Sequence, residues 1–435
     1  MSWEGFKNIL LVSLILISGL LTWSYWFYQP SYDEADKNDY VQEKIFSTLE
    51  PDEVVRPTKM MYHKDGSHFG TNSEDMITQA TSSIKKWNLF NFHDQSTTYK
   101  NAADIRAFSE KDGIIELIFN DIVPLSFYKN YLKIEDDELP NVSFDRILID
   151  TGKESVYFVS SKKKTVLEAS VDKSLIEGFK KEYARSDILR PYKKVVLSET
   201  NSILVPSGEI KVNEYDFLTK VSDVNSFKEA LFVRPSTVKQ EGDIYTDGLS
   251  IMKKNSKTLM IEYKNLVVGA KEEKTLETHI LQRSIEMINN HAGWDKRHRY
   301  ASMDEDSREI SFRLYINDLP VFNEDGMAEI HVEYGTQAVK NYQRPYFNLV
   351  EDPLDQQEVT LPSGDEALKL FKSDMGKKYD ANKLTDMTVG YKLIQDDNSG
   401  TTLLGLKPVW YYHYDGSWMD ITTEEDLGGV LDGLE

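Results

Sequence analysis

Ser-x-x-Lys pairs come nearest, by residue type and spacing, to a covalent catalytic site. Among them are three at Ser82–Lys85, Ser83–Lys86 and Ser160–Lys163. In serine acyl-transfer enzymes the serine of such a pair is the nucleophile, and a nearby base accepts the proton of its hydroxyl. Those enzymes also carry Ser-Asp-Asn and Lys-Thr-Gly motifs, and this sequence has neither. The first two pairs fall on the polar side of a predicted helix, so we interpret all three as chance matches.

Histidines and clustered carboxylates are the residues that could bind a metal ion. His291 and His298 lie near Asp295 and Asp304, but this spacing fits no zinc-ligand pattern. The segment Asp396–Gly400 lacks the length and the closing glutamate of a calcium loop, so we interpret it as a hairpin turn. The chain has no cysteine, no P-loop and no dinucleotide motif. We therefore expect no catalytic residue, no metal site and no cofactor.

Aromatic side chains gather near the carboxyl end of the sequence. On a strand, Trp410, Tyr412 and Tyr414 share one face, while Tyr411 takes the other. One face is expected to lie in the core. The other could contact a protein, because aromatic residues concentrate binding energy at interfaces. Together with Trp418, the first three residues form our candidate aromatic interface.

Composition limits the possible partners. The chain has 435 residues, of which 28% are charged and 40% are hydrophobic, as in folded rather than disordered proteins. Its formal net charge is −21. Nucleic-acid binding depends on clustered basic residues that neutralise phosphates, so we expect no nucleic-acid partner.

The element that positions everything else is an apolar stretch near the amino terminus. Ile9–Tyr28 contains no charged residue and ends in a run of aromatic rings. Twenty residues of helix span roughly 30 Å, which is the thickness of the bilayer core. No small-residue cleavage site follows, so we predict a retained transmembrane helix rather than a signal peptide. Lys7 before it and the acidic segment Asp33–Asp39 after it favour a short cytoplasmic tail, residues 1–8, with the bulk outside the cell.

Small residues on one side of this predicted helix could contact a second helix. Ser18 and Thr22 are four residues apart, beside Gly19. Such spacing allows close approach of helices in lipid. These three residues are our candidate transmembrane contact face, and the alternative is a span without a partner.

The remaining chain predicts an α+β fold with three extracytoplasmic domains, at 29–198, 199–348 and 349–435. In the first, three strands at Phe144–Asp150, Ser155–Ser160 and Thr165–Val171 precede a helix at Asp172–Tyr183. In the second and third, a helix is followed by a short antiparallel meander. We interpret these two as related modules, although common Asp-Gly hairpins could also produce the likeness.

Several motifs resemble the YycH (WalH) family. They are TWSYWFYQP after the apolar stretch, INNHAGW at Ile288–Trp294, LPVFNEDG at Leu319–Gly326, VEYGTQAVKNYQRP at Val332–Pro345, and VGYKL with KPVWYYHYDGSW between Val389 and Trp418. The resemblance is densest from Leu276 onward.

The resemblance implies a membrane-anchored accessory protein without catalytic residues. Its implied partners are the sensor histidine kinase WalK (YycG), which acts with the response regulator WalR (YycF), and a similar single-span protein, YycI. The later domains would resemble YycI, and the regulated system controls cell-wall metabolism in Gram-positive bacteria. The alternative function is that of an extracytoplasmic cell-envelope enzyme or wall-polymer-binding protein.

Overall fold

The computed structural model describes residues 7, 17–18, 46–99, 101–136, 138–199, 201–267, 279–335, 338–395 and 403–421. The chain separates into two compact units, Met1–Glu43 and Lys44–Glu435. In the first unit Lys7, Ile17 and Ser18 are helical. Within the described ranges, no helix is long and apolar enough to cross a membrane. The rest of the predicted span Ile9–Tyr28, including Gly19 and Thr22, lies outside the described residues.

The amino-terminal part of the second unit is built on a ten-stranded sheet. Its order is β10-β9-β2-β1-β4-β6-β7-β8-β3-β5, and every neighbouring pair is antiparallel except β3 and β5. The strands are β1 (Lys59–Lys64), β2 (Ser67–Thr71), β3 (Asn88–Asp94), β4 (Ile114–Pro124), β5 (Lys133–Ile134), β6 (Ser143–Asp150), β7 (Ser155–Ser160), β8 (Thr165–Ser170), β9 (Arg190–Val196) and β10 (Ser202–Pro206).

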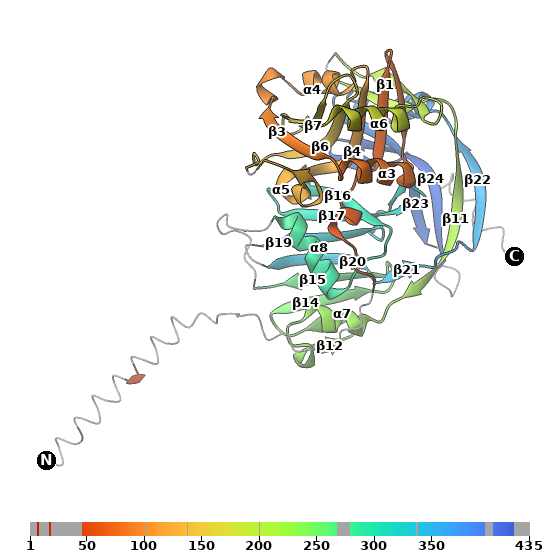
Figure 1. The fold of residues 1–435 in the computed structure, drawn as a ribbon. Coiled ribbons are helices and arrows are strands. Elements are labelled where there is room, and N and C mark those ends of the chain that lie inside the picture. Colours follow the sequence, from red (N-terminus) through yellow and green to blue (C-terminus); the bar gives the residue numbers. More distant parts are fainter. Residues whose placement is uncertain are drawn as a thin grey trace. The chain divides into compact units, whose positions relative to one another are not determined.

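Helices cover both faces of this sheet (Figure 1). They are α2 (Pro51–Val54), α3 (Glu74–Ile84), α4 (Ala102–Ser109), α5 (Leu125–Tyr128) and α6 (Lys173–Tyr183). Alternate residues of a strand point to opposite faces. Ile147 and Ile149 of β6 therefore share a core with α3 and α6, whereas Leu148 shares a core with α4.

The predicted meander and its helix are confirmed almost to the residue. β6, β7 and β8 follow one another with short turns, and α6 begins immediately after Asp172. The Asp172 carboxylate accepts a hydrogen bond of 2.7 Å from the backbone N–H of Ser174, which satisfies a free donor of the first helical turn. Ile176 and Phe179 of α6 are buried, as their helical spacing predicts.

The carboxyl-terminal part contains a second sheet of fifteen strands. Its main order is β12-β13-β14-β15-β20-β19-β17-β18-β23-β24-β11-β21, with β16 beside β17, β22 beside β11 and β25 beside β24. The strands are β11 (Ile210–Val221), β12 (Lys239–Glu241), β13 (Ile244–Thr246), β14 (Ser250–Asn255), β15 (Met260–Asn265), β16 (His298–Asp304), β17 (Glu309–Ile316), β18 (Leu319–Phe322), β19 (Glu329–Tyr334), β20 (Val339–Pro345), β21 (Phe347–Leu349), β22 (Asp355–Leu361), β23 (Leu384–Gln395), β24 (Leu403–Tyr414) and β25 (Ser417–Met419).

Three helices pack beside this sheet: α7 (Val224–Leu231), α8 (Ile280–His291) and α9 (Gly364–Met375). The chain is therefore a mixed α+β protein with extensive antiparallel sheets, as predicted. Several strands were missed by the sequence analysis. Among them are β11 and β22, which lie side by side at one edge of the molecule (Figure 1).

One large apolar core runs through both parts of the second unit. It includes Ile115 and Phe158 of the first sheet and Phe312 and Leu406 of the second. A separate core surrounds Phe371 of α9. The division into domains 29–198, 199–348 and 349–435, and the kinship of the last two, remain predictions.

Candidate functional site

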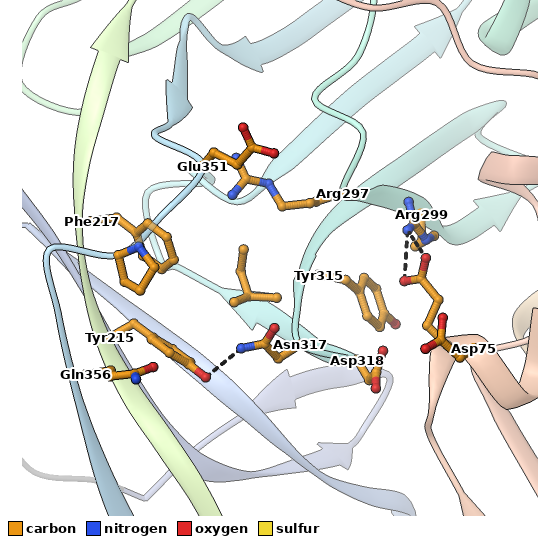
Figure 2. Close-up of a pocket in the computed structure, with 13 residues that line it drawn as sticks. Asp75, Tyr215, Phe217, Arg297, Arg299, Tyr315, Asn317, Asp318, Glu351 and Gln356 are labelled. Carbon is orange, nitrogen blue, oxygen red and sulfur yellow. Dashed lines mark hydrogen bonds and ion pairs between the residues drawn. The ribbon is translucent and has the colours of Figure 1, made fainter.

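A cleft of about 420 Å³ opens where the two sheets meet (Figure 2). Its walls come from segments far apart in the sequence: the first turn of α3, strand β11, the start of β16, the turn between β17 and β18, and the loop that leads into β22. A volume of this size is within the range of small-molecule sites in proteins. The cleft is therefore the first candidate for a functional site.

Ion pairs fasten one wall of the cleft, on the side of α3. Glu74 accepts hydrogen bonds from Arg299 at 3.1 Å to each carboxylate oxygen, and it pairs with Arg56 at 2.5 Å. Burial by itself raises the pKa of the Glu74 carboxyl, but the hydrogen bond from Arg56 and the charge of Arg299 outweigh it and hold this pKa below its ordinary value. The pairing connects α3 of the first sheet to β16 of the second.

The turn between β17 and β18 brings a further carboxylate to the same wall. Asn317 and Asp318 both have positive φ angles, 44° and 69°, which suit the tight turn of a hairpin. Burial, and then the charges of Glu74 and Asp75, raise the pKa of the Asp318 carboxyl, although the backbone N–H of Glu74 and the charge of Arg56 lower it. Three carboxylates thus share this end of the cleft.

A second arginine of the cleft, Arg297, is held in place by three hydrogen bonds. Arg297 donates two parallel hydrogen bonds to Asp295, at 2.8 and 2.7 Å, and one of 3.0 Å to the carbonyl of Leu349. Figure 2 shows its side chain reaching toward Glu351. Burial by itself raises the pKa of the Asp295 carboxyl, but the hydrogen bond and the charge of Arg297 outweigh it and hold this pKa below its ordinary value.

Aromatic rings and amides form the remaining wall. Tyr215 and Phe217 stand two residues apart on β11, and their side chains face the same space in Figure 2. The Asn317 amide donates a hydrogen bond of 2.6 Å to the Tyr215 hydroxyl. The Tyr315 hydroxyl donates to Asn120 at 3.1 Å. Tyr215 and Phe217 are 9% and 4% exposed, so the chemistry that these walls offer is mainly hydrogen bonding and ion pairing.

A second feature concerns the way the chain enters the unit. The docked segment, Phe46–Leu49, lies against the end of α8 and the residues that follow it. Phe46 N–H donates to the Ala292 carbonyl at 2.9 Å, Ser47 N–H to the Trp294 carbonyl at 3.2 Å, and Trp294 N–H to the Ser47 carbonyl at 2.6 Å. These main-chain bonds form an isolated antiparallel bridge between Ser47 and Trp294.

Side chains complete this docking. The Asn289 amide bonds both the N–H and the carbonyl of Leu49, at 3.0 and 2.9 Å, and accepts from the Trp294 indole at 2.8 Å. The Phe46 ring is 7% exposed and lies 4.6 Å from the buried Arg344 guanidinium. Gly293 has φ +79°, and a β-carbon there would stand 2.6 Å from the Phe46 carbonyl oxygen. Only glycine allows this approach.

Three of the four residues proposed for an aromatic interface lie inside the protein. Trp410, Tyr412 and Tyr414 are 6%, 1% and 7% exposed, and they pack around Phe371 of α9. Their polar atoms bond to the carbonyls of Pro362, Ala367 and Lys378. These three rings could therefore contact a partner protein only if α9 moved away from β24. Trp418 is partly exposed, against Phe322 and His413, and an interface there remains a prediction.

Of the predicted transmembrane contact face, only Ser18 is among the described residues, where it is helical. The contact face of Ser18, Gly19 and Thr22 therefore remains a prediction. Of the four residues considered as metal ligands, His298 and Asp295 are buried, His291 is partly exposed and Asp304 is exposed. Burial lowers the pKa of His298 to about 4.

The sequence analysis missed the cleft and the docking of Phe46–Leu49. The motif INNHAGW contains Asn289, Gly293 and Trp294, and the motif ending in QRP contains Arg344, but both were used only as marks of resemblance. A tryptophan directly after a glycine at a helix end was the available sign of a close main-chain contact. No sequence pattern joins Glu74, Tyr215 and Asp318, because they meet only in the folded chain.

Comparison with known proteins gives a consistent result. Two family models match, the YycH protein N-terminal domain at residues 4–187 and the YycH protein C-terminal domain at residues 200–426. A curated protein of Bacillus subtilis (strain 168), "Two-component system WalR/WalK regulatory protein YycH", is 24% identical over 446 residues, covering 97% of each chain. The crystal structure of YycH from Bacillus subtilis has a TM-score of 0.73 at 23% identity, over 88% of this chain and 99% of that one, and so shares the fold.

Proposed function

The chain belongs to the YycH family, and from this premise we infer that it regulates a two-component system of the WalR/WalK type by contact rather than by catalysis. The observation that carries this proposal is the similarity to a protein named as such a regulator over 97% of both chains. The proposed partners are the sensor kinase and a YycI-like single-span protein. The proposed location is the cell membrane, with residues 1–8 in the cytoplasm and the second unit outside.

The docking of Phe46–Leu49 fixes the point at which the chain enters the second unit. This segment is the first described part of the chain after the predicted span, and it is hydrogen-bonded to Asn289 of α8 and to Trp294, which follows α8. A regulator shifts a two-state kinase only by binding one state more tightly than the other.

The experiment is cross-linking in native membranes, with photoreactive residues placed at positions 18 and 22. We expect adducts with the sensor kinase or with a second single-span protein. Recovery of neither partner at native expression would contradict the proposal.

A pair of variants then tests the contact face. Ser18→Leu/Thr22→Leu keeps the span apolar but fills the predicted contact face. Ser13→Leu is the matched control, since position 13 lies on the opposite side of a helix with 3.6 residues per turn. We expect the double variant to change kinase-dependent expression of cell-wall genes and Ser13→Leu to leave it unchanged. Equal effects of the two variants would mean that this face is not the contact.

One observation favours part of the alternative function, that of a wall-polymer-binding protein. This observation is the polar, aromatic-lined cleft, which is compatible with the regulatory role, since a regulator can also bind a ligand outside the cell.

A further inference from the structure

Two histidines face each other near the turn of the β1–β2 hairpin. His63 of β1 and His68 of β2 are direct cross-strand partners, and their Nδ1 atoms lie 2.7 Å apart. The two rings meet edge to face, with centroids 4.9 Å apart. At this separation one hydrogen must lie between the two nitrogens, because two lone pairs or two N–H groups would repel each other. We call these two residues the histidine pair.

His63 is held in place from inside the protein. It is fully buried, and its Nε2 lies 2.6 Å from a carboxylate oxygen of Glu116, which is fully buried as well. An ionised carboxylate only accepts hydrogen bonds, so this nitrogen carries a hydrogen and donates it. Arg146 of β6 donates to the other oxygen of Glu116 at 2.7 Å. His63 therefore cannot turn away without breaking a buried, charge-assisted hydrogen bond.

His68 is the member of the histidine pair that solvent reaches, because it is only partly buried. Glu110, which follows α4, and Lys194 of β9 form an ion pair close to it. Burial and then the charge of His63 lower the pKa of His68. Glu110 raises this pKa, Lys194 lowers it, and Glu116 raises it least. The charges further away, which interact with Arg146, are Asp145 beside it, Lys59 of β1, Arg106 of α4 and Asp386 of β23.

The geometry limits how many protons the histidine pair can take up. With both rings neutral, the Nδ1–H of His68 donates to the lone pair on Nδ1 of His63. One further proton can bind to the outer nitrogen of His68, and the contact remains. A second proton must then bind to Nδ1 of His63, where it brings two N–H groups face to face. It also places two like charges directly opposite each other on neighbouring strands, which is destabilising.

We propose that the histidine pair is a pH-sensitive switch of the β1–β2 hairpin, which stays closed with at most one positive charge and opens when both rings are charged. Because Glu116 holds His63, His68 is the ring that moves. β2 lies between β1 and β9, so its displacement affects the hydrogen bonds on both of its sides. The meaning of this switch as a sensor of external acidity rests on the proposed location outside the cell, whereas the conformational change itself does not.

The size of the effect follows from the number of protons bound. In the open hairpin each histidine has its ordinary pKa of 6.5, so at pH 5.5 each ring favours the protonated form roughly tenfold. The open hairpin takes up two protons, and the closed pair takes up only one. Opening should therefore become about tenfold more favourable at pH 5.5 than at pH 7.5.

The test is hydrogen exchange of the full chain in detergent micelles, measured by mass spectrometry at pH 7.5 and 5.5. Rates are expressed as protection factors, which removes the pH dependence of exchange itself, and EDTA excludes any effect of a metal ion bound by the two rings. We expect the protection factors of peptides within Lys59–Thr71 to fall about tenfold at the lower pH. Equal protection at the two pH values in the unmodified protein would overturn the proposal.

A pair of variants assigns the effect to the histidine pair. In His68→Asn, the amide stands where Nδ1 stood and can either donate or accept, so it bonds His63 in both protonation states and carries no charge. The loss of protection at pH 5.5 should therefore disappear. His93→Asn is the matched control, because His93 is an exposed histidine on β3 of the same sheet, and the loss should remain there. The same loss in His68→Asn as in the unmodified protein would refute the assignment.

Discussion

Gly293→Ala gives the sharpest test of how the docked segment Phe46–Leu49 is held. The left-handed conformation at φ +79° costs a residue with a β-carbon about 1–2 kcal/mol. The new β-carbon would also stand 2.6–2.7 Å from main-chain atoms of Phe46 and Ser47, which cannot rotate away as a side chain could. The docked segment must then move and lose its three main-chain hydrogen bonds, at about 0.5–1.5 kcal/mol each, or about 1.5–4.5 kcal/mol together.

The matched control is Gly416→Ala, in the turn before β25. Gly416 has φ +83°, but nothing lies within 4 Å of the added β-carbon, so this variant has the backbone strain without the collision. The difference between the two variants therefore isolates the docking.

Hydrogen exchange measured by mass spectrometry suits a protein of this size, because it reports local opening without assuming two-state unfolding. In Gly293→Ala, the amides of Ser47 and Trp294 should exchange roughly 10- to 1,000-fold faster, since each 1.4 kcal/mol is a factor of ten. Peptides from β6 and β7 should be unchanged in both variants. If the Ser47 amide exchanges at the same rate in Gly293→Ala and in Gly416→Ala, the close approach at Gly293 does not hold the docked segment, and the reasoning is wrong.

Three further predictions concern buried groups. Glu116 is fully buried against Arg146; burial raises the pKa of its carboxyl, but the charge of Arg146 and a hydrogen bond from a histidine lower it to about 2. Glu116→Gln should therefore cost about 3–5 kcal/mol of unfolding free energy at pH 7, and this difference from the unmodified protein should shrink as the pH falls from 4.5 toward 2. Burial lowers the pKa of His298 to about 4 in the folded protein, below its value of 6.5 in the unfolded chain, so the unfolded chain takes up the proton first as the pH falls. Thermal melting should therefore show about 2 kcal/mol of stability lost through His298 between pH 7 and 5, and His298→Gln should abolish that loss. Phe371 stacks on Tyr412 at 4.1 Å, so Phe371→Ala should destabilise the region of α9 by about 3–5 kcal/mol and raise the exchange of β24 amides, whereas an unchanged exchange pattern would mean that this core is not what keeps the aromatic rings inside.

Local patterns predicted local elements well. β6, β7, β8 and α6 were expected at almost their observed bounds, because each is specified by its own alternation, turn residues and cap. β11 was missed although it has twelve residues. Its burial pattern shifts between Val212 and Tyr215, so no clean alternation marks it. β22 was missed because its first four residues are exposed and polar, and its pairing with β11 supplies its strand structure.

The aromatic run shows where residue type alone was insufficient. Trp410, Tyr412 and Tyr414 were expected to share a face, and all three belong to the same buried core. Whether that face meets solvent, a partner or α9 depends on the position of Phe371, some forty residues earlier in the chain.

The sequence by itself determined the composition class, the apolar stretch at the amino end, the α+β character and the family motifs, because each of these is a property of neighbouring residues. Tertiary structure alone decided the cleft and the docking of Phe46–Leu49. Glu74 and Arg299 are 225 positions apart, and Leu49 and Asn289 are 240 apart. Contacts of that separation depend on how the strands of two sheets are ordered, and no local periodicity encodes that order.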